Sequence, residues 1–215
     1  MVSVTIYMEG GVLPHANIPA ATINNSNRLR EGFNKLFRQI FAVEDFDLKI
    51  EMGSGEKQAA VFFKESIKRG EAAVLLLDVY KHKGKISKLE EFGLANNSQQ
   101  VFFMVREMEA WILSQLDVLE KFGTLENLIR QKPTIALKED KSLQGIAIKD
   151  IDKPSDTLKV LLGRYYKNRR GKKQKYGKLK NAPAMIELLD IKSLRDSFED
   201  VENLILYIQR KKEIN

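Results

Sequence analysis

The sequence predicts an α/β protein with a mainly parallel, Rossmann-like sheet, helices on both faces and a helical C-terminal part. Two observations carry this prediction. Apolar segments of strand length alternate with amphipathic segments of helical period along the first half of the chain. Two of the apolar segments are continuous, which is typical of strands covered on both faces. Sheets of this kind bind ligands beyond the carboxyl ends of their strands.

Four segments are predicted to be strands: 2–8, 46–52, 72–77 and 101–105. The segment 46–52 alternates strictly between apolar and charged residues, which indicates a half-exposed strand near the sheet edge. The runs 72–77 and 101–105 are continuously apolar and therefore buried. Between them, residues 81–100 form a polar excursion.

Helical periodicity predicts six helices. Three lie in the first half of the chain, over 28–41 after an Asn27 N-cap, over 56–69 and over 107–122. The other three are one capped by Ser155 or Asp156 and ending near Tyr165, a short one at Pro183, and one from Ser193 to Ile208. Residues 123–153 show no regular pattern. We therefore expect an α/β core over residues 1–122 and a helical extension over 123–215, packed together as one domain.

The composition limits the function classes. The chain has 215 residues, 43% hydrophobic and 30% charged, which suits a soluble globular protein. No apolar run could span a membrane, and the lack of cysteine excludes thiolate zinc sites and favours a cytoplasmic location. Because only His15 and His82 are present, a bound metal would be Mg²⁺ or Mn²⁺ with oxygen ligands.

Acidic residues follow three of the predicted strands. Glu9 follows the first, Asp78 the third, and Glu107 and Glu109 the fourth. Parallel strands bring these ends to one edge, where the carboxylates would repel each other unless a cation such as Mg²⁺ joined them. An acid can also end a strand simply because strand ends meet water. Gly10 and Gly11 would let a phosphate approach the turn after Glu9 closely.

A basic segment spans residues 164–180. It holds nine basic residues and no acidic one, which exceeds the net charge of +7 of the whole chain. The predicted nucleic-acid contacts are Arg169, Arg170, Lys172, Lys173, Lys175 and Lys178. Tyr165, Tyr166 and Tyr176 lie among them and could stack on unpaired bases. A solvated loop, or a surface for an acidic protein, is the alternative.

Several blocks of the sequence resemble a known family. They are Ile6-Tyr7-Met8-Glu9-Gly10-Gly11, Arg28-Leu29-Arg30-Glu31-Gly32-Phe33, Leu75-Leu76-Leu77-Asp78, Val105-Arg106-Glu107-Met108-Glu109-Ala110-Trp111, Lys178-Leu179-Lys180-Asn181-Ala182-Pro183 and Glu187-Leu188-Leu189-Asp190. Together they resemble a bacterial, Toprim-like family catalogued as domain of unknown function 4276. It is related to the Toprim domains of overcoming-lysogenization-defect nucleases.

The resemblance implies roles for individual residues. Glu9 would be the Toprim glutamate, a general acid/base or metal ligand, and Asp78 the first acid of the Asp-x-Asp metal motif. Glu109 would match the family's helix glutamate and Lys138 its single lysine. Tyr80 stands where the second motif acid would fall, so either Glu107 or Glu109 replaces it or metal-dependent catalysis is lost.

The leading functional expectation is a Mg²⁺- or Mn²⁺-dependent, Toprim-like nuclease acting on DNA or RNA. The resemblance also implies a phage-defence setting and a partner ATPase of the AAA or ABC type. Glu9, Asp78 and Glu109 would be catalytic, and Glu107 would join them as a metal ligand. The alternatives are a non-catalytic subunit that binds an ATPase or nucleic acid, and a protein that binds a nucleotide or small phosphorylated ligand.

Overall fold

The fold is built on one parallel sheet. The computed structural model describes residues 1–11, 19–80 and 84–214, so His15 and His82 lie outside the described residues. The sheet has the order β2-β1-β3-β4 with all pairs parallel, and its strands are β1 (Val2–Glu9), β2 (Phe46–Gly53), β3 (Ala73–Val79) and β4 (Val101–Val105). The α/β class, the four strands and the edge position of 46–52 are confirmed.

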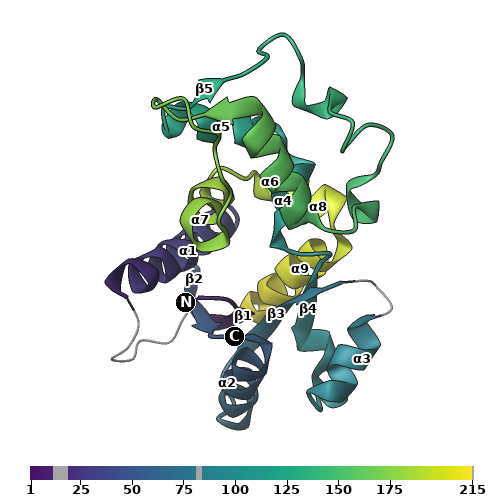
Figure 1. Cartoon of the computed structure of the whole chain (residues 1–215). Helices are drawn as coiled ribbons and strands as arrows, with labels where there is room; N and C mark the ends of the chain where they lie inside the picture. Colours follow the sequence, from purple (N-terminus) through teal and green to yellow (C-terminus); the bar gives the residue numbers. More distant parts are fainter. Residues whose placement is uncertain (12–18, 81–83, 215) are drawn as a thin grey trace.

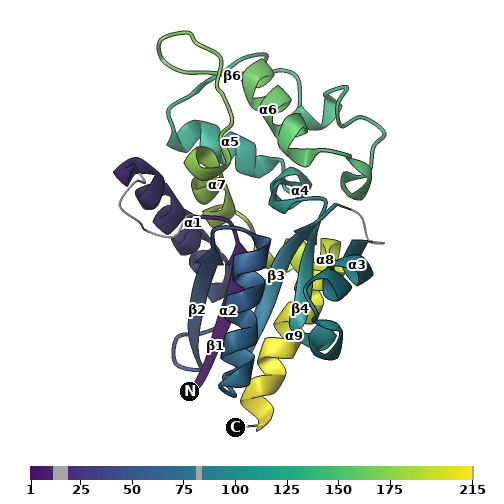
Figure 2. The same cartoon turned by 60° about the horizontal axis from the view of Figure 1, so that its bottom comes forward.

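Helices cover both faces of this sheet (Figures 1 and 2). Alternate residues of β1, such as Val4 and Ile6, face a large core with α1 (Ala20–Arg38) and α9 (Glu199–Ile214). On the other face, residues such as Leu75 pack against α2 (Glu56–Lys68) and the segment 84–100, which contains α3 (Gly84–Glu91) and the 3₁₀ turn η1 (Ala95–Gln100).

A helical part lies beyond the carboxyl ends of the strands (Figure 2). Its helices are α4 (Met108–Ser114), α5 (Asp117–Leu125), α6 (Pro154–Tyr165), α7 (Lys178–Glu187) and α8 (Ile191–Ser197). Between them lie the antiparallel strands β5 (Ile129–Arg130) and β6 (Tyr166–Lys167) and the 3₁₀ turns η2 (Leu137–Glu139) and η3 (Ile148–Asp150). Among the described helices, none has the length and apolar character that a bilayer crossing requires.

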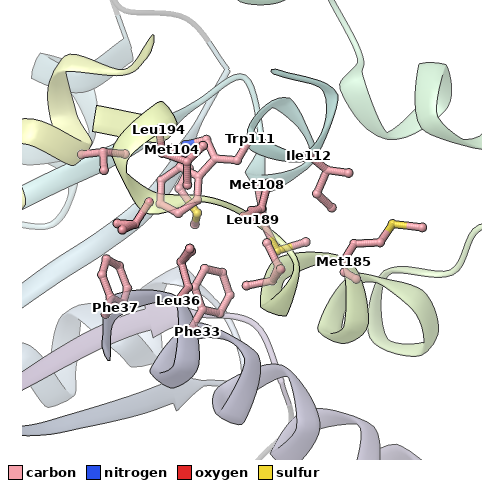
Figure 3. Close-up of a cluster of buried hydrophobic side chains, with 14 of the residues drawn as sticks. Phe33, Leu36, Phe37, Met104, Met108, Trp111, Ile112, Met185, Leu189 and Leu194 are labelled. Carbon is pink, nitrogen blue, oxygen red and sulfur yellow. The ribbon is translucent and has the colours of Figure 1, made fainter. Parts of the chain in front are cut away.

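One hydrophobic core joins the sheet to the helical part. Phe33 of α1, Trp111 of α4 and Met185 of α7 belong to the same cluster of buried side chains (Figure 3). Helices α1 and α7 approach closely at Gly32, where a Cβ would lie 2.8 Å from the carbonyl oxygen of Pro183. The larger core therefore runs without interruption from β1 to α9.

Several predicted helix limits are wrong. Asn27 lies inside α1, which begins at Ala20, because the polar first turns give no apolar stripe. The predicted helix 107–122 is two helices, because Gln115 leaves helical geometry and its side-chain amide exchanges two hydrogen bonds with the backbone of Asp190. The excursion 81–100 contains α3, whose polar sequence buries no side chain fully.

The helix starts in the C-terminal part also differ. Lys153 precedes α6, so neither Ser155 nor Asp156 is its N-cap. Helix α7 begins at Lys178 and carries Pro183 in its interior. The last predicted helix divides into α8 and α9 at Phe198, whose backbone is extended.

Candidate functional site

The strand order brings Glu9 and Asp78 to the centre of the carboxyl edge of the sheet. β1 and β3 are neighbours, paired from Thr5↔Ala73 to Met8↔Leu76. The chain leaves β1 for β2 on one side, whereas β3 and β4 extend the sheet on the other. The end of β1 is therefore the topological switch point, where parallel sheets bind their ligands.

Glu9 is half-buried beside Asp78. Burial raises the pKa of Glu9 from 4.5 to about 9, and the charge of Asp78 and a hydrogen bond with it add to the shift. With this pKa Glu9 is protonated at neutral pH, so the pair of carboxyl groups carries one proton. Gly10 and Gly11 follow with φ of 109° and 66°, values that glycine adopts without strain.

Asp78 has two differently placed oxygens. Its Oδ2 accepts a hydrogen bond from Lys178 Nζ at 3.2 Å. Its Oδ1 is buried, and no N–H or hydroxyl group of the described residues donates to it. A buried oxygen of this kind is costly unless a donor or a cation satisfies it. The proton of Glu9 can fill that role, and so can a metal ion.

Glu109 enters the cluster from the first turn of α4. The turn before it is strained, because Arg106 and Glu107 adopt φ of 78° and 154° although neither is glycine. The Glu109 residue is only 1% exposed. Its Oε1 accepts a hydrogen bond from the Tyr176 hydroxyl at 2.8 Å, and its Oε2 is buried without a hydrogen-bond partner among the described residues.

The pKa of Glu109 is raised, chiefly by burial and also by Asp78, although Lys178 and Tyr176 act against the shift. The negative charge of Asp78 therefore contributes to the raised pKa of Glu109. Glu9, Asp78 and Glu109, called the carboxylate cluster below, are thus brought together as the strand ends predicted.

Glu107 faces another way. Its Oε2 accepts a hydrogen bond from the backbone N–H of Ser155, at 2.9 Å, in the first turn of α6. The negative charge there complements the helix dipole. Arg106 does not pair with Glu107 but with Asp152, at 3.0 Å. Glu107 is therefore a helix cap in this structure rather than a member of the carboxylate cluster.

Lys178 lies at the centre of the cluster, a position that the charge pattern did not reveal. Burial acts to lower the pKa of Lys178, but the charges of Asp78, Glu109 and Glu9 outweigh it and raise that pKa. The buried side chain of Asn181 fixes the start of α7, because its Oδ1 accepts from the Gly177 N–H at 2.9 Å. Lys178 is exposed, and its ammonium pairs with Asp78 of the carboxylate cluster.

The tyrosines of the basic segment are also inside the protein. Tyr165, Tyr166 and Tyr176 are all buried. Tyr166 donates to Glu120 at 2.6 Å, and Tyr176 donates to Glu109. The prediction that they stack on bases is wrong, because their rings fill the core. By contrast, the side chains of the turn after β6 are exposed: Arg169, Arg170, Lys172, Lys173 and Lys175.

Two family-derived positions lie away from the cluster's contacts. Tyr80 is half-exposed, and the Arg106 guanidinium lies over its ring at 5.4 Å. Lys138 lies in η2 and lines a hollow with Leu116 and Asp117 at the start of α5. Neither contact brings a further ligand to the carboxylate cluster.

The carboxylate cluster fits a metal ion of one kind only. The described part of the chain has no group of three or more histidine, aspartate or glutamate side chains placed to hold an ion. Mg²⁺, however, commonly binds one or two carboxylates and completes its shell with water and substrate phosphates. Asp78 Oδ1 and Glu109 Oε2 are two buried carboxylate oxygens without a hydrogen-bond partner among the described residues, which makes them the candidate ligands.

The comparisons with known proteins establish one relationship. A family model described as Domain of unknown function (DUF4276) matches residues 20–208. Because this range covers most of the chain, the protein belongs to that family, as its sequence blocks predicted. No curated protein and no solved structure matches the chain. The relationship to Toprim domains therefore stays a prediction.

Proposed function

We propose that this member of the DUF4276 family is a cytoplasmic, Mg²⁺- or Mn²⁺-dependent phosphodiesterase that hydrolyses nucleic acid at the carboxylate cluster. One observation carries the proposal. Two buried carboxylate oxygens, from Asp78 and Glu109, have no hydrogen-bond partner among the described residues, and Asp78 ends β3 beside the switch point of the sheet. Unpaired acceptors of this kind are retained where a cation or donor arrives with a ligand.

Asp78 and Glu109 would hold the metal ion. When bound, Mg²⁺ supplies positive charge that neutralises a phosphate oxygen and acidifies water. Lys178 already faces Asp78, and its ammonium would turn to a phosphate oxygen once the ion neutralises that carboxylate. A Cβ at Gly10 would meet, among the described residues, only Leu29 at 3.9 Å, which leaves space for the phosphate at this turn.

Glu9 would move the proton. Because its pKa is about 9, it holds a proton at neutral pH and can give it to the leaving oxygen as a general acid. Burial is the largest cause of that pKa, and Asp78 adds to it. The exposed cations of the turn, Arg169, Arg170, Lys172, Lys173 and Lys175, would hold the rest of the strand. A partner ATPase and a role in phage defence belong to the same proposal.

A cleavage assay tests this function. Wild-type protein and the Glu9→Gln variant are incubated with labelled DNA and RNA in Mg²⁺, Mn²⁺ or EDTA, alone and with any ATPase encoded beside the protein. We expect metal-dependent cleavage that falls by about 100-fold or more in Glu9→Gln. Glu51→Gln, which changes an exposed carboxylate of β2, is the matched control and should keep its activity. Equal activity of Glu9→Gln and Glu51→Gln would refute the assignment.

A second candidate is a non-catalytic subunit that binds an ATPase or nucleic acid. The ion pair of Asp78 with Lys178 and the proton shared with Glu9 favour it, because they neutralise Asp78 without a metal ion. This candidate predicts no cleavage in any metal. It also predicts that Lys178→Ala weakens folding, because Asp78 then loses the cation with which it pairs.

A further inference from the structure

A second site of opposite charge lies beside helix α6. It is a hollow of about 550 Å³ lined by five cationic side chains, Lys132, Lys159, Arg164, Lys167 and Lys173, and is called the basic hollow below. Its volume lies in the range of ligand sites. Four of these cations, Lys132, Lys159, Arg164 and Lys167, were not among the predicted nucleic-acid contacts. The basic hollow is therefore a new feature of the molecule.

The cations of the basic hollow are only partly neutralised by the protein. Arg164 pairs with the buried carboxylate of Asp140, and Lys159 pairs with Asp156 at 2.8 Å. Lys132, Lys167 and Lys173 have no ion-pair partner in the part of the chain that the structure describes. Three unpaired ammonium groups around one hollow repel each other, and an anion that entered would relieve that repulsion.

The backbone holds these lysines in place. Lys167 belongs to β6, pairs with Ile129 of β5, and bridges to Lys173 on its other side. The turn between Lys167 and Lys173 is closed by Asn168, whose side-chain oxygen accepts from the N–H groups of Arg170 and Lys172. The lysines are therefore presented by a fixed ladder rather than by a loose loop.

Lys132 adds a second indication. Its φ of 54° places a non-glycine residue in the left-handed region, next to Pro133. Such strained positions gather where a ligand is held. The N–H of the preceding residue, Gln131, donates to the Tyr165 carbonyl at 2.6 Å and anchors this side of the hollow to α6.

The basic hollow also lies near the carboxylate cluster. The pKa of Lys159 is raised, first by its hydrogen bond and charge pairing with Asp156, and further by the charges of Glu107 and Glu109. Helix α6, which carries Lys159 and Arg164, packs against α4, which carries Glu109. The exposed Arg169, Arg170 and Lys172 extend the positive surface from the hollow.

We propose that the basic hollow binds backbone phosphates of a nucleic-acid strand, as a second contact site beside the carboxylate cluster. The choice of nucleic acid as ligand rests on the proposed function, but the inference does not require hydrolysis. A small polyphosphate, such as a free nucleotide tail, has the same recognition chemistry and is distinguished by the test.

The test measures binding in EDTA, so that metal-dependent cleavage plays no part. A fluorescent single-stranded oligothymidylate is titrated with wild type, the triple variant Lys132→Ala/Lys167→Ala/Lys173→Ala, and its triple Lys→Arg counterpart at several salt concentrations. The matched control is Lys64→Ala/Lys68→Ala/Lys192→Ala, which removes the same charge from lysines that line no part of the hollow. Thermal unfolding checks that all variants fold.

We expect the triple alanine variant to bind about 10- to 100-fold more weakly at 0.1 M salt. The slope of the logarithm of the binding constant against the logarithm of the salt concentration should become shallower by about 2, as the loss of three phosphate contacts predicts. The arginine variant and the control should bind like wild type. Equal losses in the triple alanine variant and the control would overturn the inference. Tripolyphosphate that binds the basic hollow without displacing the oligothymidylate would also overturn the inference, because the ligand of the hollow would then be a small polyphosphate. If the strand binds through the basic hollow but is not cleaved in the metal-containing assay, only the proposed hydrolysis is refuted.

Discussion

The carboxylate cluster and the basic hollow are built in opposite ways. In the carboxylate cluster the charges are buried, and the protein compensates them from within by Lys178, Tyr176 and a shared proton. In the basic hollow the cations lie at the surface, and three of the five have no ion-pair partner among the described residues. The difference indicates that the cluster is arranged for chemistry at defined atoms and the hollow for attraction of a polyanion.

The two sites share one stretch of sequence. The basic segment 164–180 begins in the basic hollow with Arg164 and ends in the carboxylate cluster with Lys178. Its total charge therefore says little about where any one of its cations works. The predictions below separate the two sites, from the largest expected effect to the smallest.

The largest effect should distinguish Glu109 from Glu107, which lie in one turn but face different partners. Glu109→Gln should lower nucleic-acid cleavage by about 100-fold or more, because it removes a proposed ligand of the metal ion. Glu107→Gln should keep its activity within a few-fold and lose only about 1 kcal/mol of stability at the start of α6. Cleavage rates and urea unfolding of both variants measure this. The reverse order of activities would move the metal site to Glu107.

The buried ion pair of the basic hollow should matter more for stability than its exposed one. Arg164→Met should cost about 3 kcal/mol, because Asp140 stays buried without its cation. The matched control, Lys159→Met, breaks the exposed pair with Asp156 in the same hollow and should cost much less than Arg164→Met, because water screens this pair. Equal losses in urea unfolding would contradict the difference in burial.

The same pair gives an acid-side pH dependence. Burial acts to raise the pKa of Asp140, but hydrogen bonds from Ser142 and Arg164 outweigh it and hold that pKa below its ordinary 3.8. The pair's contribution is therefore complete above about pH 4 and is lost as the pH falls below it. Wild type should lose more stability than Arg164→Met between pH 5 and pH 2. Parallel pH profiles of the two proteins would contradict this.

Glu9→Gln should stabilise the metal-free protein. The pKa of Glu9 is about 9 in the folded protein, and its ordinary value is 4.5. Between these pH values Glu9 ionises in the unfolded chain but stays protonated in the folded protein, so its ionisation favours unfolding more and more as the pH rises. Glutamine does not ionise. The variant should therefore gain roughly 1–3 kcal/mol over wild type at pH 8 and nothing at pH 4. Urea unfolding in EDTA, with Glu51→Gln as control, would contradict the account if the gain were absent or independent of pH.

The smallest effect concerns Tyr176. Tyr176→Phe removes the donor to the buried Glu109 Oε1 and should cost about 1–2 kcal/mol, with no change in the salt slope of nucleic-acid binding. Tyr207→Phe, in α9, is the control. Unchanged stability of Tyr176→Phe would contradict a contribution of this hydrogen bond to folding.

The sheet and its acidic edge could be predicted because short-range patterns specify them. The continuous run ending at Asp78 and the strict alternation of 46–52 were enough to place both strands. Strand order then brought Glu9 and Asp78 together. The segment 84–91 escaped prediction because its helix has no fully buried residue and hence no apolar stripe.

The rest of the site depends on long-range packing. Lys178 and Asp78 are 100 residues apart in the sequence, and Tyr176 and Glu109 are separated by 67. Charge counting assigned Tyr176 to a nucleic-acid surface and gave Lys178 no acidic partner, because a local pattern cannot show contacts with distant residues such as Glu109 and Asp78. The sequence block that begins at Lys178 was the one available signal, since it resembled the family and not merely a basic run.

The most direct test of the metal site is calorimetric titration of Mn²⁺ into wild type, Asp78→Asn and Glu109→Gln, with Glu51→Gln as control. The account predicts one site in wild type and in Glu51→Gln, with affinity at least 10-fold weaker in each of the other two variants. Absence of Mn²⁺ binding to wild type, or equal binding by Asp78→Asn, would contradict a metal ion held by Asp78 and Glu109.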